Sequence, residues 1–203
     1  MNSPTISKDS PLILASSSPR RKRLLRQIGI PFRARSSHVE ETIIVEGSLI
    51  SPGNLAVKKA EAAGSASQNN WILGADTVVV LGETSLGKPK DAEDAHAMLS
   101  QLSGKEHRVI TGFCLLDPNR DAAHTEEITT LVRVKKLTEQ EIRGYIATGE
   151  PFGKAGGYGI QGVGAFIVES ISGSYSNVVG LPLCALVKAL CRNGALKTFP
   201  IKP

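Results

Sequence analysis

Serine and arginine residues cluster where a short apolar run meets the start of an expected helix. Residues 11–15 have the length of a buried strand, and three serines and a proline follow them. Serine before proline is typical of a helix start, so the expected helix covers residues 19–27. The amides of a helix N-terminus, the hydroxyl groups from Ser16 onward and the guanidinium groups of Arg20 and Arg21 all suit phosphate oxygens. These residues alone leave two interpretations equally open: a phosphate site, or a serine-capped helix with a solvated basic face.

A single carboxylate lies within the most apolar stretch of the chain, residues 71–81, which is the strongest strand candidate although residues 74–77 interrupt it. Burying the Asp76 carboxylate costs free energy unless the group is ion-paired or binds a metal. Asp76 is therefore a candidate Mg²⁺ ligand or a base that activates water beside a phosphate, with Glu40 as a second oxygen ligand. The competing interpretation is an aspartate on an edge strand that hydrogen-bonds a turn.

Two lysines and one glutamine are further candidates in less informative settings. Lys88 lies between a glycine and a proline, and Lys59 lies in an alanine-rich expected helix over residues 55–66. Most lysines in such positions are simply solvated. Residues 153–164 are dense in glycine, which allows a backbone to approach a ligand closely, and Gln161 carries both a donor and an acceptor that can read a base. A structural turn is the alternative for that segment.

The histidines and cysteines do not have the spacing of a metal site. The four histidines are expected at the surface or at helix caps: His38, His96, His107 and His124. Cys184 and Cys191 are seven residues apart and are expected on one buried helix face. Three scattered cysteines favour a reducing compartment.

Strands and helices are intermixed along the whole chain. The expected helices cover residues 19–27, 55–66, 92–102, 138–147 and 182–191, and the expected strands cover 11–15, 31–35, 71–81, 109–116, 128–134 and 165–171. Asp91 and Thr138 are the expected N-caps, with Glu141 at the capping-box position. The mixture predicts an α/β fold with a mixed twisted sheet and flanking helices. Residues 1–10 are expected to be a flexible tail, 11–195 the folded domain and 196–203 a C-terminal tail.

Composition excludes several classes of protein. With 203 residues, 41% hydrophobic and 21% charged, the chain has the composition of an ordinary globular protein, and no apolar run reaches the roughly 18 residues of a membrane span. The first ten residues lack the apolar core of a signal peptide, which favours a cytoplasmic location. The net charge of +5 suits either a nucleic acid or a nucleotide as partner, although five Phe, three Tyr and one Trp are few for a base-stacking platform.

Taken together, these motifs resemble the Maf family of nucleoside triphosphate pyrophosphatases. The resemblance covers residues 11–195 and is carried by LILASSSPRR (12–21), VEET (39–42), KA (59–60), GADTVV (74–79), GKP (87–89), LSGKEH (102–107), EP (150–151), KAGGYGIQG (154–162) and GLP (180–182). It implies a fold similar to that of the inosine-triphosphate pyrophosphatases, with two lobes around a cleft. It also implies hydrolysis of a nucleoside triphosphate to the monophosphate and pyrophosphate with a divalent metal, Mg²⁺ or Mn²⁺, and a homodimer.

Motif by motif, the resemblance gives each candidate residue a role. Asp76 is the implied general base, and Glu40 and Asp76 are the implied metal ligands. The implied triphosphate contacts come from Ser16, Arg20, Arg21, Lys59, Lys88 and Lys154. Substrate choice is implied to rest on Arg20, Thr77 and Gln161. The branch acting on dTTP and UTP has glutamine at the position of Gln161, whereas the branch acting on 7-methyl-GTP has glutamate.

The chain departs from the family pattern at Gly153, where aspartate is usual, and at Gly157, where alanine is common. Neither change removes an implied catalytic group. The predicted function is hydrolysis of dTTP and UTP, with no nucleic-acid or membrane partner. One alternative is a pyrophosphatase for modified nucleotides such as 7-methyl-GTP. The other is a basic nucleic-acid-binding or regulatory protein, which would require the excess charge to form one broad stripe.

Overall fold

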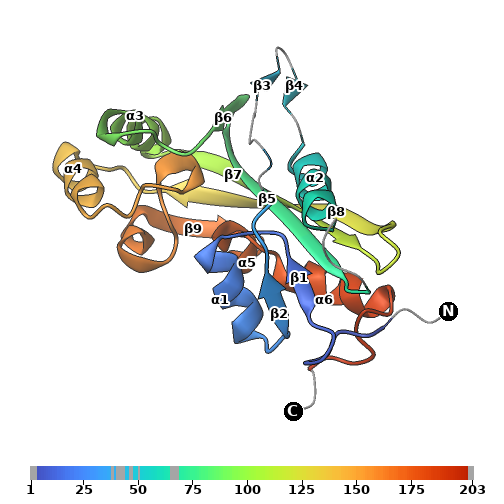
Figure 1. The fold of residues 1–203 in the computed structure, drawn as a ribbon. Helices are drawn as coiled ribbons and strands as arrows, with labels where there is room; N and C mark the ends of the chain where they lie inside the picture. Colours follow the sequence, from blue (N-terminus) through green and yellow to red (C-terminus); the bar gives the residue numbers. More distant parts are fainter. Residues whose placement is uncertain are drawn as a thin grey trace. The chain divides into compact units, whose positions relative to one another are not determined.

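Within the residues that the structure describes, seven strands form one mixed β-sheet (Figure 1). The computed structural model describes residues 4–37, 39, 44–45, 48–49, 51–64 and 69–200. The strand order is β2-β1-β5-β7-β8-β9, with β6 paired to β5, and helices connect the strands. This confirms the predicted α/β class with a mixed sheet and flanking helices. By its internal contacts the chain divides into two units, Met1–Asp76 with Thr111–Ile128 and Gly180–Pro203, and Thr77–Ile110 with Thr129–Val179.

The first unit is organised around a parallel strand–helix–strand arrangement. β1 (Leu12–Leu14) leads through α1 (Pro19–Gln27) to β2 (Phe32–Ala34), and β1 pairs in parallel with both β2 and β5 (Ile72–Leu81). All three residues of β1 are buried, and its backbone is paired on both edges. Its remaining elements are α2 (Pro52–Gly64), α6 (Leu183–Arg192), parts of β7 (Glu106–Leu116) and β8 (Ala122–Val134), and the antiparallel pair β3 (Ile44–Val45) and β4 (Ser48–Leu49).

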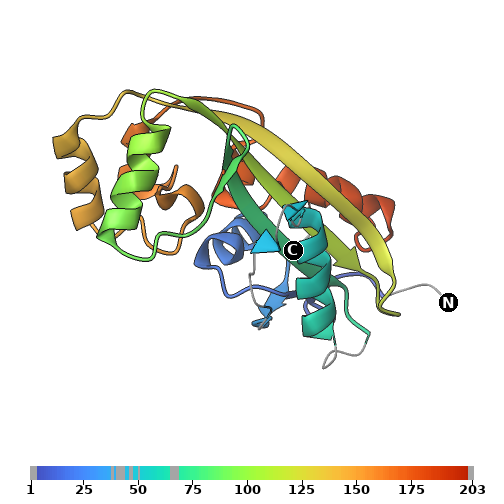
Figure 2. The same cartoon turned by 90° about the horizontal axis from the view of Figure 1, so that it is seen from above.

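Helix α2 packs so closely on the sheet that two strand positions beneath it require glycine (Figures 1 and 2). A Cβ atom on Gly74 of β5 would lie 2.0 Å from the carbonyl oxygen of Ala56. A Cβ atom on Gly112 of β7 would lie 2.3 Å from the amide nitrogen of Gly53. Small residues of α2, including Ala60, complete this part of the core. The close approach brings the side chains of α2 within reach of β5.

The second unit has its own core between helices and the strand segments. Its elements are β6 (Thr84–Leu86), α3 (Ala92–Leu102), α4 (Glu139–Ala147), the 3-10 turns η1 (Ala155–Gly157) and η2 (Gly162–Ile167), β9 (Val168–Ser172) and α5 (Tyr175–Val179). Helices α3 and α4 pack side by side (Figure 2). Leu99, Leu102, Ile142 and Tyr145 from these helices meet Val132 of β8 in the core.

Local capping signals place the starts of α3 and α4 correctly. The Asp91 carboxylate accepts a hydrogen bond from the Asp94 amide at 2.8 Å at the start of α3. Thr138 and Glu141 form the predicted capping box at the start of α4. Both caps confirm the sequence-based predictions, because each depends on residues only three positions apart.

Three strand predictions need correction. β8 begins at Ala122, six residues before its expected start at residue 128. β5 runs unbroken from Ile72 to Leu81, although an interruption was expected at residues 74–77. The strand expected over 165–171 begins only at Val168, because Gly162–Ile167 form the 3-10 turn η2. Of the apolar residues that follow Gly164 in this turn, only Ile167 is buried, so they do not form a pleated strand face.

Residues near both ends of the chain pack against each other within the first unit. The amide of Ile6 donates to the carbonyl oxygen of Ala195 at 2.8 Å, and Ile6 is buried. The indole N–H of Trp71 donates to the carbonyl oxygen of Pro4 at 2.9 Å. The division of the chain at residues 11 and 195 stays a prediction, and the residues just before the first boundary contribute to the core.

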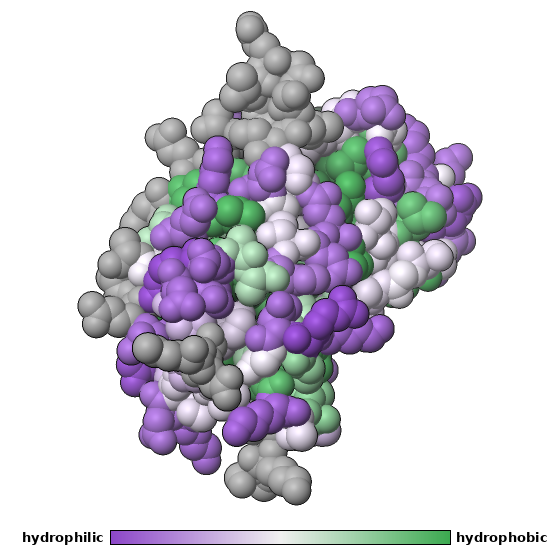
Figure 3. Space-filling model, turned by 90° about the vertical axis from the view of Figure 1, so that its right-hand side faces the viewer, coloured by the Kyte–Doolittle hydropathy of each residue, from purple (hydrophilic) through white to green (hydrophobic). Residues whose placement is uncertain are grey.

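The surface is mainly hydrophilic on the face shown in Figure 3. Among the described residues, no helix combines the length and the apolar character that crossing a membrane requires. Cys184 and Cys191 are exposed, which corrects their expected place in the core. Helix α6 turns its leucines inward, and the two cysteines lie outside the buried stripe formed by Leu186 and Leu190.

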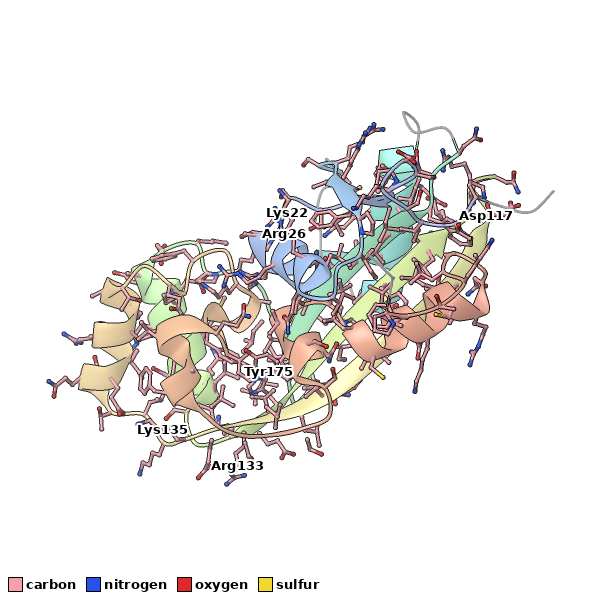
Figure 4. All side chains as sticks on the ribbon, turned by 90° about the horizontal axis from the view of Figure 1, so that it is seen from below. Lys22, Arg26, Asp117, Arg133, Lys135 and Tyr175 are labelled. Atoms are coloured by element: carbon pink, nitrogen blue, oxygen red, sulfur yellow. The ribbon has the colours of Figure 1, made fainter. Side chains whose placement is uncertain are left out.

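Basic side chains are distributed over separate elements (Figure 4). Lys22 and Arg26 extend from α1, as expected for its solvated face. Arg133 pairs with Glu169 at 3.2 Å, and Lys135 pairs with Glu141 at 2.5 Å. At these last two positions the positive charge is balanced locally by a carboxylate.

Candidate active site

The turn between β1 and α1 is held together by serine hydroxyls. Ser16 follows β1 and is buried, and its hydroxyl oxygen accepts a hydrogen bond from the amide of Ser18 at 3.2 Å. Ser18 is the N-cap of α1, and its hydroxyl oxygen accepts from the amide of Arg21 at 3.5 Å. The turn therefore presents the N-terminal end of a nine-residue helix beyond the carboxyl end of a parallel strand, a common position for binding phosphate.

Arg21 is a buried cross-link within the first unit. Its Nε donates to the carbonyl oxygen of Gly180 at 2.8 Å, and its Nη1 donates to the Ser16 hydroxyl at 3.2 Å. The side chain thus connects the helix start to the G-L-P motif, 159 positions away in the sequence. The neighbouring Arg20 is half-buried, and burial lowers the pKa of its guanidinium, which still stays protonated at neutral pH. The two adjacent arginines therefore have different environments.

Lys59 and Asp76 form a buried ion pair. Lys59 Nζ lies 2.6 Å from Asp76 Oδ1, and the two residues are 6% and 7% exposed. Asp76 lies two positions after Gly74, so both side-chain positions are on the face of β5 that α2 covers. Lys59 comes from that helix. The missing Cβ of Gly74 allows the approach that brings ammonium and carboxylate together.

The position of Asp76 rules out the edge-strand interpretation. β5 lies between β1 and β7 in the sheet order. The register pairs Leu14 with Leu73, and the amide of Ala15 donates to the carbonyl oxygen of Leu73 at 2.8 Å. Ser16 and Asp76 therefore both lie beyond the last paired residues of β1 and β5, on the same carboxyl side of these parallel strands. The first unit holds five of the predicted residues: Ser16, Arg20, Arg21, Lys59 and Asp76.

The other predicted residues of the site lie in the second unit or outside the described residues. Thr77 is half-buried in β5, and Lys88 is exposed in the G-K-P turn. Lys154 Nζ donates to the backbone carbonyl oxygen of Glu150. Gln161 is half-buried and directly precedes η2. Glu40 lies outside the residues that the structure describes.

His107 is buried, which corrects its expected place at the surface or at a cap. It is 2% exposed, its Nε2 lies 2.7 Å from the Tyr158 hydroxyl, and burial lowers its pKa to about 4. The two rings meet edge to face at 5.4 Å between centroids. The alternating burial of β7 was the missed signal, because His107 shares a strand face with the buried Val109.

Asp76 offers the oxygen donor that a hard divalent cation prefers. Among the described residues, no group of three or more His, Cys, Asp or Glu side chains is arranged to hold a metal. A carboxylate oxygen of this kind is used in Mg²⁺ sites that combine one or two carboxylates with substrate phosphates.

Comparisons with known proteins agree with the motifs. A family model described as Maf-like protein matches residues 11–193. The chain is 48% identical over 194 residues to a dTTP/UTP pyrophosphatase of Syntrophotalea carbinolica, covering 94% of this chain and 88% of that protein. It is 50% identical over 190 residues to a dTTP/UTP pyrophosphatase of Citrifermentans bemidjiense, covering 93% and 98%.

A solved structure is also similar, at much lower identity. The nucleoside-triphosphatase (dITP/XTP pyrophosphatase) of Mycobacterium abscessus aligns with a TM-score of 0.42 and 15% identity, covering 92% of this chain and 96% of that chain. A likeness of this size carries no conclusion about activity. The family match over residues 11–193 and the near-complete coverage of the relatives are decisive: the chain belongs to the Maf family.

Proposed function

We propose that this chain hydrolyses dTTP and UTP to the nucleoside monophosphate and pyrophosphate. The relatives that are about half identical over nearly their whole length carry this activity in their names. The observation that carries the proposal within this chain is the buried Lys59–Asp76 pair beside the β1–α1 turn. A carboxylate, an ammonium group and a helix N-terminus on one side of a parallel sheet form a suitable setting for phosphate chemistry.

In the proposed reaction a water molecule attacks the α-phosphorus. A bond forms between the water oxygen and the phosphorus, and the bond from the α-phosphorus to the oxygen bridging the α- and β-phosphates breaks. Asp76 accepts the proton of the water, and the electron pair of the broken bond leaves with pyrophosphate. Lys59 Nζ, 2.6 Å from Asp76 Oδ1, places a positive charge beside the proposed base.

The remaining groups of the first unit position the triphosphate. Ser16 and the helix N-terminus supply neutral donors, and Arg20 supplies a charged one. Arg21 acts on this turn through its bonds to Ser16 and Gly180. A divalent metal on Asp76, with Glu40 as a further ligand, would stabilise negative charge on the phosphate oxygens.

The proposed roles of the residues in the second unit rest on the family motifs to which they belong. Lys88 and Lys154 contact the phosphates, and Thr77 and Gln161 select the base. Gln161 presents both a donor and an acceptor, as recognition of thymine and uracil edges requires. A homodimer remains part of the prediction, and sedimentation of the purified chain tests it.

A nucleotide panel tests the function directly. The purified chain is supplied with dTTP, UTP, the other common nucleoside triphosphates and 7-methyl-GTP, each with Mg²⁺ or Mn²⁺, and pyrophosphate and orthophosphate are measured separately. We expect pyrophosphate and the monophosphate to be released in equal amounts, and the rate of release to be highest with dTTP and UTP. Release of orthophosphate, or preference for a purine nucleotide, would contradict it.

A further inference from the structure

Glu150 occupies a central position in the second unit that no catalytic role explains. Its carboxylate oxygen Oε1 accepts hydrogen bonds from the Tyr145 hydroxyl at 3.0 Å and from the Gly164 amide at 3.0 Å. Oε2 accepts from the Val163 amide at 2.8 Å. One carboxylate therefore receives three hydrogen bonds, two of them from backbone amides that follow the glycine-rich segment.

Tyr145 extends this network to the other side of Gln161. Its hydroxyl donates to Glu150 and accepts a hydrogen bond from the Gly159 amide at 3.1 Å. The backbone is thus held at Gly159, two residues before Gln161, and at Val163 and Gly164, two and three residues after it. Tyr145 is 2% exposed, so the hydroxyl cannot easily exchange these partners for water.

The glycines of this segment allow the backbone to lie directly on the network. A Cβ atom on Gly162, whose φ is +70°, would lie 2.5 Å from Oε2 of Glu150. A Cβ atom on Gly164 would lie 2.5 Å from the Tyr145 hydroxyl oxygen. Burial alone would raise the pKa of Glu150, but the hydrogen bonds from Gly164, Val163 and Tyr145, together with the charge of Lys154, lower that pKa below its ordinary value, so the carboxylate is ionised at neutral pH.

We infer that Glu150, acting with Tyr145, is a positioning residue that fixes the conformation of residues 159–164 and thereby the orientation of Gln161 toward the base. This inference rests on the proposed function for the role of Gln161, whereas the network itself does not. Glu150 acts on selectivity through the backbone and has no contact with the reacting phosphate in this assignment.

Glu150→Gln is the first test, because it keeps the shape and removes the charge. With its amide oxygen in the Oε1 position, the glutamine turns an N–H donor toward the Val163 N–H donor. Tyr145→Phe removes only the hydroxyl that joins Glu150 to Gly159. Glu169→Gln, on β9 of the same unit in an exposed pair with Arg133, is the matched control.

The first readout is amide hydrogen exchange without nucleotide. Exchange at the Val163 amide, which loses its acceptor in Glu150→Gln, is expected to rise at least about tenfold, with smaller rises at Gly159 and Gly164, and to stay unchanged in Glu169→Gln. Tyr145→Phe is expected to raise exchange mainly at Gly159. Unchanged exchange in both variants overturns the network as a conformational restraint, whatever the activity of the enzyme.

The second readout is steady-state kinetics with UTP and 7-methyl-GTP. In Glu150→Gln the KM for UTP is expected to rise about tenfold with kcat within about threefold, and the preference for UTP should fall with it. A general loss of kcat with an unchanged preference would show a structural role only and would overturn the inference. If Glu150→Gln does not fold, hydrogen exchange and steady-state kinetics of Tyr145→Phe test the inference instead. A wild-type chain that hydrolyses neither dTTP nor UTP would refute the proposed function and the part of the inference that concerns selectivity.

Discussion

Replacing Asp76 by asparagine separates the structural role of the Lys59–Asp76 pair from its catalytic role. Lys59 Nζ lies 2.6 Å from Asp76 Oδ1, and both residues are less than a tenth exposed. Removing one partner of such a pair leaves the other charge buried without its counter-charge, which costs about 3–5 kcal/mol. Because small domains unfold with about 5–15 kcal/mol, the variant is expected to stay folded at 25 °C with reduced stability.

A double-mutant cycle measures whether the pair is coupled. Asp76→Asn and Lys59→Met are expected to destabilise the chain separately, and the double variant should cost less than their sum by about 1–3 kcal/mol. Unfolding in urea is followed by the fluorescence of Trp71, the single tryptophan, which is buried at the start of the same strand region. Additive effects would contradict the coupling read from the 2.6 Å distance.

The same variant tests the proposed base. Pyrophosphate release from UTP by Asp76→Asn is expected to fall by about 10²–10⁴, the usual contribution of a general base. Circular dichroism at the assay temperature is the control for folding. Near-normal release by a folded Asp76→Asn chain would refute the assignment of Asp76 as the base.

Three further predictions follow from other parts of the structure. The pKa of His107 is lowered from 6.5 to about 4 by burial, so the unfolded chain binds the extra proton between these values. Stability should therefore fall by about 2 kcal/mol from pH 7 to pH 5, and urea midpoints should show this loss in wild type and not in His107→Gln. Gly74→Ala, whose Cβ would lie 2.0 Å from the Ala56 carbonyl oxygen, should lower the unfolding free energy by about 1–3 kcal/mol. Gly144→Ala in α4, where the space is open, should raise the unfolding free energy by up to about 1 kcal/mol. Equal effects of the two substitutions in thermal melts would contradict the close packing of α2. Gln161→Glu should shift preference from UTP toward 7-methyl-GTP, because the ionised side chain loses its amide donor, and an unchanged ratio of kcat/KM values would count against its role.

The starts of α1, α3 and α4 and most strands could be predicted because their signals are local. The caps at Asp91 and Thr138 depend on hydrogen bonds across three residues, and the predicted helix over residues 19–27 coincides with α1. The predicted strand and helix boundaries were wrong where tertiary packing decided between two local structures. Residues 165–167 have the apolar character of a strand but form the end of a 3-10 turn, with Ile167 buried in the core of the second unit.

The candidate site was only partly predictable. Asp76 could be recognised as a carboxylate in an apolar run, but its partner could not, since Lys59 looks like any other lysine of an alanine-rich helix. Gly74 was the sequence feature that indicated a covering helix, because a glycine two positions before Asp76 lets α2 approach the strand. His107 was missed for a related reason: burial of a polar side chain depends on what covers the strand, and its partner Tyr158 is 51 positions away.

The sequence by itself determined the family and the residue types available for phosphate chemistry, because these are properties of motifs and their order. Only the tertiary structure decided how each cation is used. Lys59 is buried against a carboxylate, Arg21 donates to Ser16 and Gly180, and Lys88 is exposed in its turn. The physical reason is that a charged side chain is stable in the interior only when it has a partner there. That partner comes from a distant part of the chain, so no local sequence pattern predicts it.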